Sequence, residues 1–240
     1  MAGPLEQFEI KTLAPIKLGT LDASFTNASL FMALAVVAIT VFIVGGMRGR
    51  DLVPGRWQSM AEMSYEFIAG MVRENVGHDG RQFFPFVFSL FMFILLGNLL
   101  GMIPYSFTFT SHIIVTFALA ALVFVLVTIV ALVKHGLHFF TYFFPSGAPI
   151  AMAPLLIPIE ILSYLSRPVS LSIRLFANMM AGHTMLKVFA GFTVAMGIFG
   201  VAPLLLNVAL TGFEVLVAVL QAYVFTILTC LYLRDALHLH

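Results

Sequence analysis

Charged residues are scarce in this sequence, and their scarcity excludes an ordinary soluble protein. Asp, Glu, Lys and Arg make up 10% of the 240 residues, whereas about 25% is usual in soluble domains. Hydrophobic residues make up 61%, and no charged side chain occurs between Asp22 and Arg48 or between Arg81 and Lys134. Uncharged runs of about twenty residues are long enough to cross a bilayer as helices. The sequence therefore predicts an all-α protein that crosses the membrane several times.

Other absences narrow the function. The single cysteine, Cys230, excludes an internal disulfide. The 12 basic and 11 acidic residues nearly cancel, which argues against a nucleic-acid partner because such partners select a strongly basic surface. No HExxH, GxSxG or paired-aspartate motif occurs, so we expect neither an enzyme nor a bound metal or cofactor. The chain has no evident internal repeat, and residues 1–22 show neither a transit segment nor a cleavable signal pattern.

The hydrophobic runs predict one membrane domain over residues 1–240. It consists of an outer-side amino-terminal segment (1–27), a first span (28–47), an amphipathic surface helix (57–76), two spans (83–133) and a long antiparallel helical hairpin (150–233). About five helices then cross or lie embedded in the membrane. With the amino terminus outside, most basic residues fall on the cytoplasmic side, as the positive-inside rule requires; they are Arg48, Arg50, Arg56, Arg73, Arg81, Lys134 and Arg234.

The amphipathic helix is expected to pack on the membrane surface or against a partner helix. Its apolar side chains recur at helical spacing on one face, and its polar ones lie opposite. The apolar face comprises Met60, Met63, Phe67 and Met71, and the polar face Gln58, Glu62, Glu66 and Arg73.

Two polar residues near the middle spans have two readings each. Asn98, inside the second span, indicates a hydrogen bond between helices or, less simply, part of an ion path. His112, at the start of the third span, is either an interfacial histidine or part of an outer aqueous vestibule. The spans are joined by a short loop around Pro104 and Tyr105, and after Lys134 the chain turns through residues 138–149.

The stretch Ser166–His183 carries a charge where the surroundings are apolar. Arg174 lies among Leu171, Ile173 and Leu175, and a charged side chain in a bilayer is a functional-site hypothesis by default. Because arginine keeps its proton in proteins, Arg174 cannot carry protons itself; it can only attract, repel or gate another charge.

Arg174 belongs to a polar stripe on one helical face. Its members are spaced by three or four residues: Glu160, Ser163, Arg167, Ser170, Arg174 and, one turn on, Asn178. Lipid cannot solvate such a stripe, so it needs a wet cavity or a polar partner. Arg167 is either a lipid-headgroup anchor or part of an ion path, and Glu160 and Ser163 are candidates for lining that path.

The last hydrophobic segment carries a second stripe: Asn207, Thr211, Glu214 and Gln221. Folding the two segments antiparallel about the GIFGVAP turn (197–203) puts Arg174 level with Gln221 and His183 level with Glu214. Imidazoles titrate near neutral pH, so a facing His–Glu pair can exchange a proton; the alternative is a structural ion pair. Lys187, one turn beyond His183, either belongs to the same patch or extends to the outer interface.

These residues resemble subunit a of F-type ATP synthases, the proton-conducting stator subunit. The motif is matched by Ser170, Leu171, Arg174, Leu175, Asn178, Met179, Ala181 and Gly182, and a second block by Glu214, Gln221, Ala222, Tyr232 and Leu233. The resemblance implies a non-catalytic subunit with two offset proton half-channels separated by the essential arginine, here Arg174. Its partners would be a rotor ring of c subunits, peripheral-stalk b-type subunits, the lipid bilayer and protons.

The resemblance also implies roles and a location. The proton-translocating residues would be Arg174, His183, Glu214, Gln221, Asn178, Glu160, Ser170, Lys187 and His112, in a bacterial inner membrane or, alternatively, a mitochondrial one. Many bacterial relatives carry the acid and the histidine at exchanged positions relative to His183 and Glu214, whereas mitochondrial and related bacterial members have this arrangement.

Two other classes remain as alternatives. A self-contained secondary transporter or ion channel would need its own substrate site and usually an internal repeat. An intramembrane enzyme would need a catalytic motif. The sequence shows none of these features.

Overall fold

The computed structural model describes residues 8–15, 17–18, 21–22, 24–48, 54–103, 106–136, 139 and 152–238. Its helices are α1 (Asn27–Gly46), α2 (Arg56–Asn75), α3 (Phe84–Gly101), α4 (Ile113–His135), α5 (Ala153–Ala195) and α6 (Val201–Leu237). Among the described residues, all of these except α2 are long and apolar enough to cross a membrane. The predicted all-α polytopic fold is confirmed. Arg50, Pro104, Tyr105 and the turn at 140–149 lie outside the described residues.

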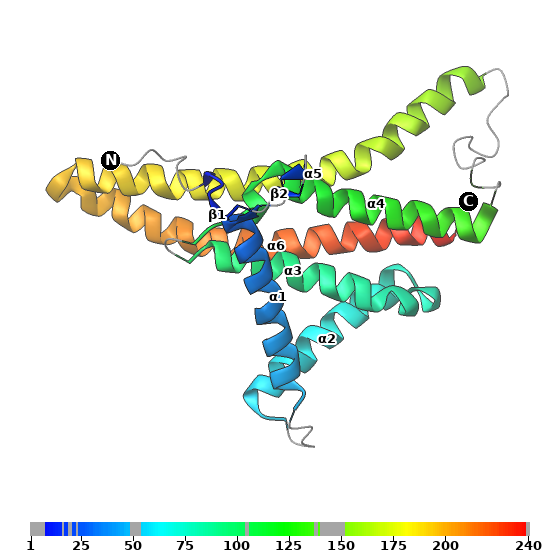
Figure 1. Cartoon of the computed structure of the whole chain (residues 1–240), viewed down its shortest axis with the longest axis horizontal. Helices are drawn as coiled ribbons and strands as arrows, with labels where there is room; N and C mark the ends of the chain where they lie inside the picture. The colour runs from blue at the N-terminus through cyan, green and yellow to red at the C-terminus, as the bar shows by residue number, and fades with distance from the viewer. Residues whose placement is uncertain are drawn as a thin grey trace.

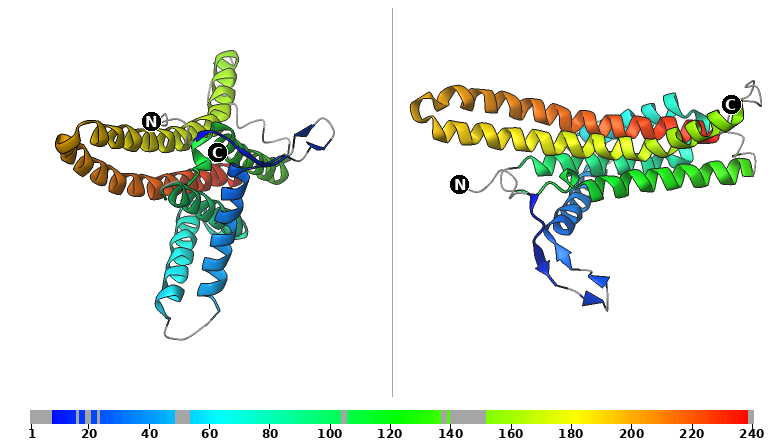
Figure 2. Two further views of the ribbon diagram at one scale, coloured as in Figure 1. Left: turned by 60° about the vertical axis from the view of Figure 1, so that its left-hand side comes forward. Right: turned by 90° about the horizontal axis from the view of Figure 1, so that it is seen from above.

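Helices α5 and α6 form the predicted antiparallel hairpin and run side by side along most of their length (Figures 1 and 2). The turn between them is shorter than predicted: a single 3-10 turn, Gly197–Gly200, connects them, and α6 begins at Val201. Pro203 therefore lies in the first turn of α6, where the missing N–H has no helical partner to lose. Gly197 has a φ of 56°, a left-handed conformation that suits glycine.

The hairpin is much longer than a bilayer is thick. The 43 residues of α5 extend about 64 Å at 1.5 Å per residue, roughly twice the 30 Å hydrocarbon core. Pro158 and Pro168 lie inside this helix, and Figure 1 shows that α5 is bent, as expected where proline removes a backbone hydrogen bond. A helix of this length has to lie strongly inclined to fit.

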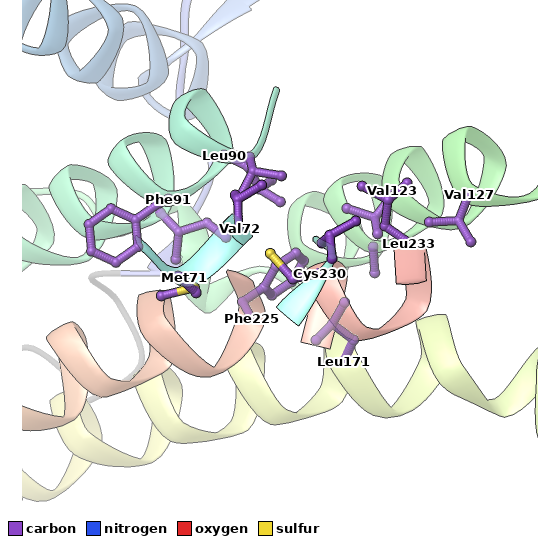
Figure 3. Packing of buried hydrophobic residues seen from close by; sticks show 14 of the residues in the cluster. Met71, Val72, Leu90, Phe91, Val123, Val127, Leu171, Phe225, Cys230 and Leu233 are labelled. Atoms are coloured by element: carbon purple, nitrogen blue, oxygen red, sulfur yellow. The ribbon is translucent and has the colours of Figure 1, made fainter. Parts of the chain in front are cut away.

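The central core joins the hairpin to α3 and α4. Figure 3 shows Leu171 of α5 and Phe225, Cys230 and Leu233 of α6 packed together with Val123 of α4. Because lipid is as apolar as these side chains, close packing and hydrogen bonds between helices hold such a bundle together.

Interhelical hydrogen bonds supplement the packing. Asn98 Nδ2 donates to Ala218 O (3.2 Å) between α3 and α6, which is the helix-joining role predicted for it. Thr116 and Ser172 share a hydrogen bond of 3.1 Å between α4 and α5. At the other end of α4, His135 Nε2 lies 3.1 Å from Ala236 O of α6. The hairpin is thus fixed to α3 and α4 at several heights.

Helices α1 and α2 project to one side of the bundle (Figure 1). The buried side chains of α2 are Ala61, Ile68, Met71 and Val72, whereas Met60, Met63 and Phe67 are exposed. The face that packs within the subunit is therefore about a quarter turn away from the apolar face, at 100° per residue, and shares Met71 with it. Ala61, Ile68 and Val72 on the buried face allow close approach to the neighbouring helices, whereas Met60 and Met63 remain exposed.

The amino-terminal segment contains strands that the sequence analysis did not predict. Strand β1 (Thr12–Ala14) pairs antiparallel with β4 (Phe25–Thr26), and β2 (Lys17–Leu18) pairs with β3 (Leu21–Asp22). The segment leads directly into α1, where Thr26 Oγ1 accepts a hydrogen bond from Ser29 N (3.3 Å) and caps the helix.

Candidate functional site

A buried ion pair lies between the two helices of the hairpin. His183 Nδ1 of α5 is 2.9 Å from Glu214 Oε1 of α6, and both side chains are less than a tenth exposed. The contact predicted from the antiparallel fold is therefore present. Neither Glu214 oxygen has an aligned hydrogen bond among the described residues, so the carboxyl is held by proximity to the imidazole and is not locked by other donors.

Thr108 contacts the opposite edge of the same imidazole. Its Oγ1 lies 2.8 Å from His183 Nε2 and donates to Gly101 O at 3.1 Å. Thr108 is buried and belongs to the connection between α3 and α4, so it reaches the hairpin from another part of the chain. No periodicity points to Thr108, and the sequence analysis missed it.

Space for the pair is provided by a glycine. A Cβ atom on Gly182 would lie 2.7 Å from Glu214 Oε1, which is closer than real contacts allow, and 3.1 Å from its Cδ. The hydrogen at this position lets the carboxyl approach α5, and a larger side chain would make the Glu214 carboxyl shift from its observed position.

A Gly182→Ala substitution is expected to push Glu214 away from His183 and to reduce by about tenfold or more the activity that the resemblance to subunit a implies, proton-driven ATP synthesis. The measurement is ATP synthesis in energised membrane vesicles, normalised to assembled complex. Gly191→Ala is the matched control, since a Cβ there meets nothing within 4 Å, and its rate should match the unmodified chain. Equal rates for both variants would contradict the prediction.

An apolar groove of about 390 Å³ opens beside this pair. Its polar lining comes from Asn178, Glu214 and Gln221, and apolar side chains such as Met185 and Phe213 make up most of the rest. Three residues predicted from the two stripes therefore meet at one groove. Gln221 is buried and Asn178 is exposed.

Arg174 lies on the same exposed face of α5. Its side chain is exposed, as are its stripe neighbours Ser170 and Asn178. No ion pair in the described part of the chain includes Arg174. The charge is thus presented outward from the subunit, and no carboxylate among the described residues neutralises it.

Arg167 has a different environment from Arg174. Its guanidinium lies 3.4 Å from Asp235 Oδ2 of α6 and contacts the rings of Tyr164 (5.4 Å) and Tyr232 (5.1 Å). The side chain therefore joins the two helices at this end of the hairpin, an interaction that neither predicted role included. Asp235 was also missed, because nothing in its sequence neighbourhood indicates a partner on α5.

The remaining predicted residues are more dispersed. His112 precedes α4 and stacks on Phe107 with ring centroids 5.0 Å apart. Burial lowers the pKa of His112 below its ordinary value, which favours the neutral imidazole. Lys187 and Glu160 are half-buried, and no ion pair among the described residues includes either of them. No contact places His112, Lys187 or Glu160 in the His183–Glu214 pair.

Comparison with known proteins agrees with the resemblance. Residues 29–234 match the family model described as ATP synthase A chain. The chain belongs to the ATP synthase subunit a family. It is 58% identical over 247 residues to ATP synthase subunit a of Paramagnetospirillum magneticum, covering all of both chains. It is 60% identical to that of Parvibaculum lavamentivorans (98% of this chain, 93% of the relative) and 56% identical to that of Pelagibacter ubique (99% and 98%).

Membership of the subunit a family decides the broad function. A subunit a is a non-catalytic component of the membrane sector of ATP synthase, so this chain takes part in ATP synthesis and ion transport and does not itself form ATP. It assembles with other ATP synthase subunits as a multi-pass membrane protein.

Proposed function

We propose that this subunit a conducts protons through two offset half-channels and couples their flow to rotation of a c-subunit ring. The observation that carries the proposal is the outward-facing Arg174, which has no carboxylate partner in the described chain. A fixed charge in a membrane is costly unless something compensates it. A ring of subunits that each carry a mid-membrane carboxyl would supply that compensation one carboxyl at a time.

The buried His183–Glu214 pair would serve the outer half-channel. The two groups lie 2.9 Å apart and can pass a proton between an imidazole and a carboxyl, which a purely apolar helix pair cannot do. The groove lined by Asn178, Glu214 and Gln221 lies beside this pair, and Asn178 is one helical turn from Arg174 on α5. Ser170 and Glu160, further along α5, would line the exit on the cytoplasmic side, and Lys187 and His112 would lie towards the outer entrance.

Arg174 would separate the two half-channels. Since its guanidinium keeps its proton, it attracts an arriving ring carboxylate and promotes release of that group's proton, but it cannot relay a proton to the other side. Protons then cross only when the ring turns. Each charge that crosses releases about 2.3 kcal/mol per 100 mV of membrane potential.

The proposal includes partners and a location. A c-subunit ring would face Arg174, and b-type subunits of the peripheral stalk would hold the subunit stationary. The relatives named above come from bacteria, which supports a bacterial inner membrane. The facing acid and base favour protons over sodium ions as the transported species.

Reconstitution tests whether the chain needs a rotor. The purified chain in liposomes is expected to show little proton flux under a membrane potential, because Arg174 blocks the direct route; a pH-sensitive dye inside the liposomes gives the measurement. Liposomes with an added protonophore are the positive control. The chain should also copurify with a small two-helix proteolipid that carries a mid-membrane carboxyl. Rapid flux through the chain alone would instead indicate a self-contained channel or transporter.

A further inference from the structure

His183 is held from two sides by groups on different parts of the chain. Its Nδ1 lies 2.9 Å from Glu214 Oε1, and its Nε2 lies 2.8 Å from Thr108 Oγ1. All three side chains are buried. The ring orientation is therefore determined by two contacts at once, and only Glu214 comes from the helix that pairs with α5.

The hydrogen bonds of Thr108 determine which atom holds the proton between it and His183. A hydroxyl has one proton to donate and accepts through its lone pairs, whereas a carbonyl oxygen only accepts. Thr108 Oγ1 lies 3.1 Å from Gly101 O, a contact that is favourable only with a proton between the two oxygens. That proton belongs to the Thr108 hydroxyl, so Thr108 accepts the hydrogen bond from Nε2–H of His183.

The neighbouring groups support this assignment. Ser106 Oγ also donates to Gly101 O, at 2.8 Å, and one carbonyl oxygen can accept both hydroxyl protons. A Cβ atom on Gly101 would collide with the Thr108 side chain. The absence of a side chain at Gly101 thus lets Thr108 lie against the carbonyl with its lone pairs directed at the imidazole.

We propose that Thr108 is a positioning residue that keeps a proton on Nε2 of His183, so that Nδ1 is the atom that exchanges protons with Glu214. This inference rests on the proposed role of the pair in proton transfer. When Glu214 is protonated, its O–H bond breaks and a new N–H bond forms at Nδ1, which leaves a carboxylate and an imidazolium. The return step reverses this, and the Nε2–H bond stays intact throughout. The ring therefore does not have to flip between steps.

Two substitutions at Thr108 separate its hydroxyl from its volume. Thr108→Val keeps nearly the same shape and removes the hydroxyl, whereas Thr108→Ser keeps the hydroxyl and removes a methyl group. Thr110→Val is the matched control: Thr110 is fully buried close by in the same connection, and its hydroxyl has no hydrogen-bond partner among the described residues. ATP synthesis in energised vesicles is measured per assembled complex. We expect a loss of about tenfold for Thr108→Val, at least half the activity for Thr108→Ser, and nearly full activity for Thr110→Val.

The tautomer of His183 provides a readout that a merely structural role would not change. The subunit is labelled with ¹⁵N-histidine and studied by ¹⁵N NMR in the assembled complex. The His183 signal is the one that disappears in His183→Gln. It should show a neutral ring that is protonated on Nε2. In Thr108→Val the signal should shift to a mixture of tautomers. A neutral ring protonated on Nδ1 in the unmodified protein would overturn the proposal, and this result does not depend on whether Thr108→Val assembles.

The activity measurements distinguish failure of this inference from failure of the proposed function. If Thr108→Val works at the normal rate while His183→Gln is inactive, Thr108 has no positioning role although the pair carries protons. If His183→Gln is also fully active, the pair itself does not take part. Equal losses in Thr108→Val and Thr110→Val would mean that packing, and not the hydroxyl, accounts for the effect.

Discussion

Replacing Arg174 with alanine is expected to reduce proton-driven ATP synthesis at least a hundredfold. This corresponds to an activation free energy raised by about 2.7 kcal/mol or more. The subunit should still assemble. Assembly should survive because the side chain is exposed and no ion pair within the described residues includes it. The function should fail because the other arginine of the stripe, Arg167, is paired with Asp235 and does not replace Arg174 in drawing a proton from a rotor carboxyl. ATP synthesis in energised vesicles, normalised to assembled complex, is the measurement.

Two further variants sharpen the Arg174 experiment. Arg174→Gln keeps much of the length and hydrogen-bonding capacity of the side chain without its charge, and should be as defective as Arg174→Ala. Ile173→Ala shortens the adjacent exposed side chain and should leave the rate nearly unchanged. Normal ATP synthesis by an assembled Arg174→Ala complex would show that the assignment of this residue is wrong.

Exchanging the buried pair is expected to restore part of the activity that either single change removes. His183→Glu alone places two carboxyl groups about 3 Å apart, and like charges at that distance cannot both ionise. Glu214→His alone places two imidazoles together. Combining His183→Glu with Glu214→His again leaves one acid and one base in contact, so the double variant should make ATP several times faster than either single variant.

A double-mutant cycle provides the test of this exchange. If the two positions act through their mutual contact, the effects of the single changes will not add, and the difference measures their coupling. Recovery is expected to be incomplete because Gly182 and Thr108 are placed for the original arrangement. A double variant no more active than the worse single variant would argue that the 2.9 Å contact is not used in transport.

The arrangement of the hairpin could be predicted because it depends on local features of the sequence. Two polar stripes with helical spacing, separated by a glycine-rich turn, are enough to bring His183 level with Glu214, and the structure has them in contact. The turn was predicted too long because Pro203 was read as part of it. A proline in the first turn of a helix costs no hydrogen bond, so the sequence alone does not separate these possibilities.

The features that were missed depend on contacts between distant segments. Thr108 reaches His183 only because α3 and α4 pack against the hairpin, and Asp235 reaches Arg167 only because α5 and α6 are long enough to meet there. On α2, the hydrophobic pattern predicts which face of the helix is apolar. The residues that pack against other helices, such as Ala61 and Ile68, lie beside that face. Hydrophobic periodicity describes which face avoids water; in a membrane it does not decide which face touches protein.

The burial of Cys230 has a practical consequence for chemistry on this subunit. The chain has one cysteine, and its side chain is completely enclosed between helices, where a labelling reagent cannot reach the sulfur. The natural subunit should therefore not react with thiol reagents, so that a newly introduced cysteine can be labelled selectively. A thiol introduced at Ile173 would be the accessible one on the subunit, and cross-links from it would identify whatever polypeptide passes in front of the neighbouring guanidinium.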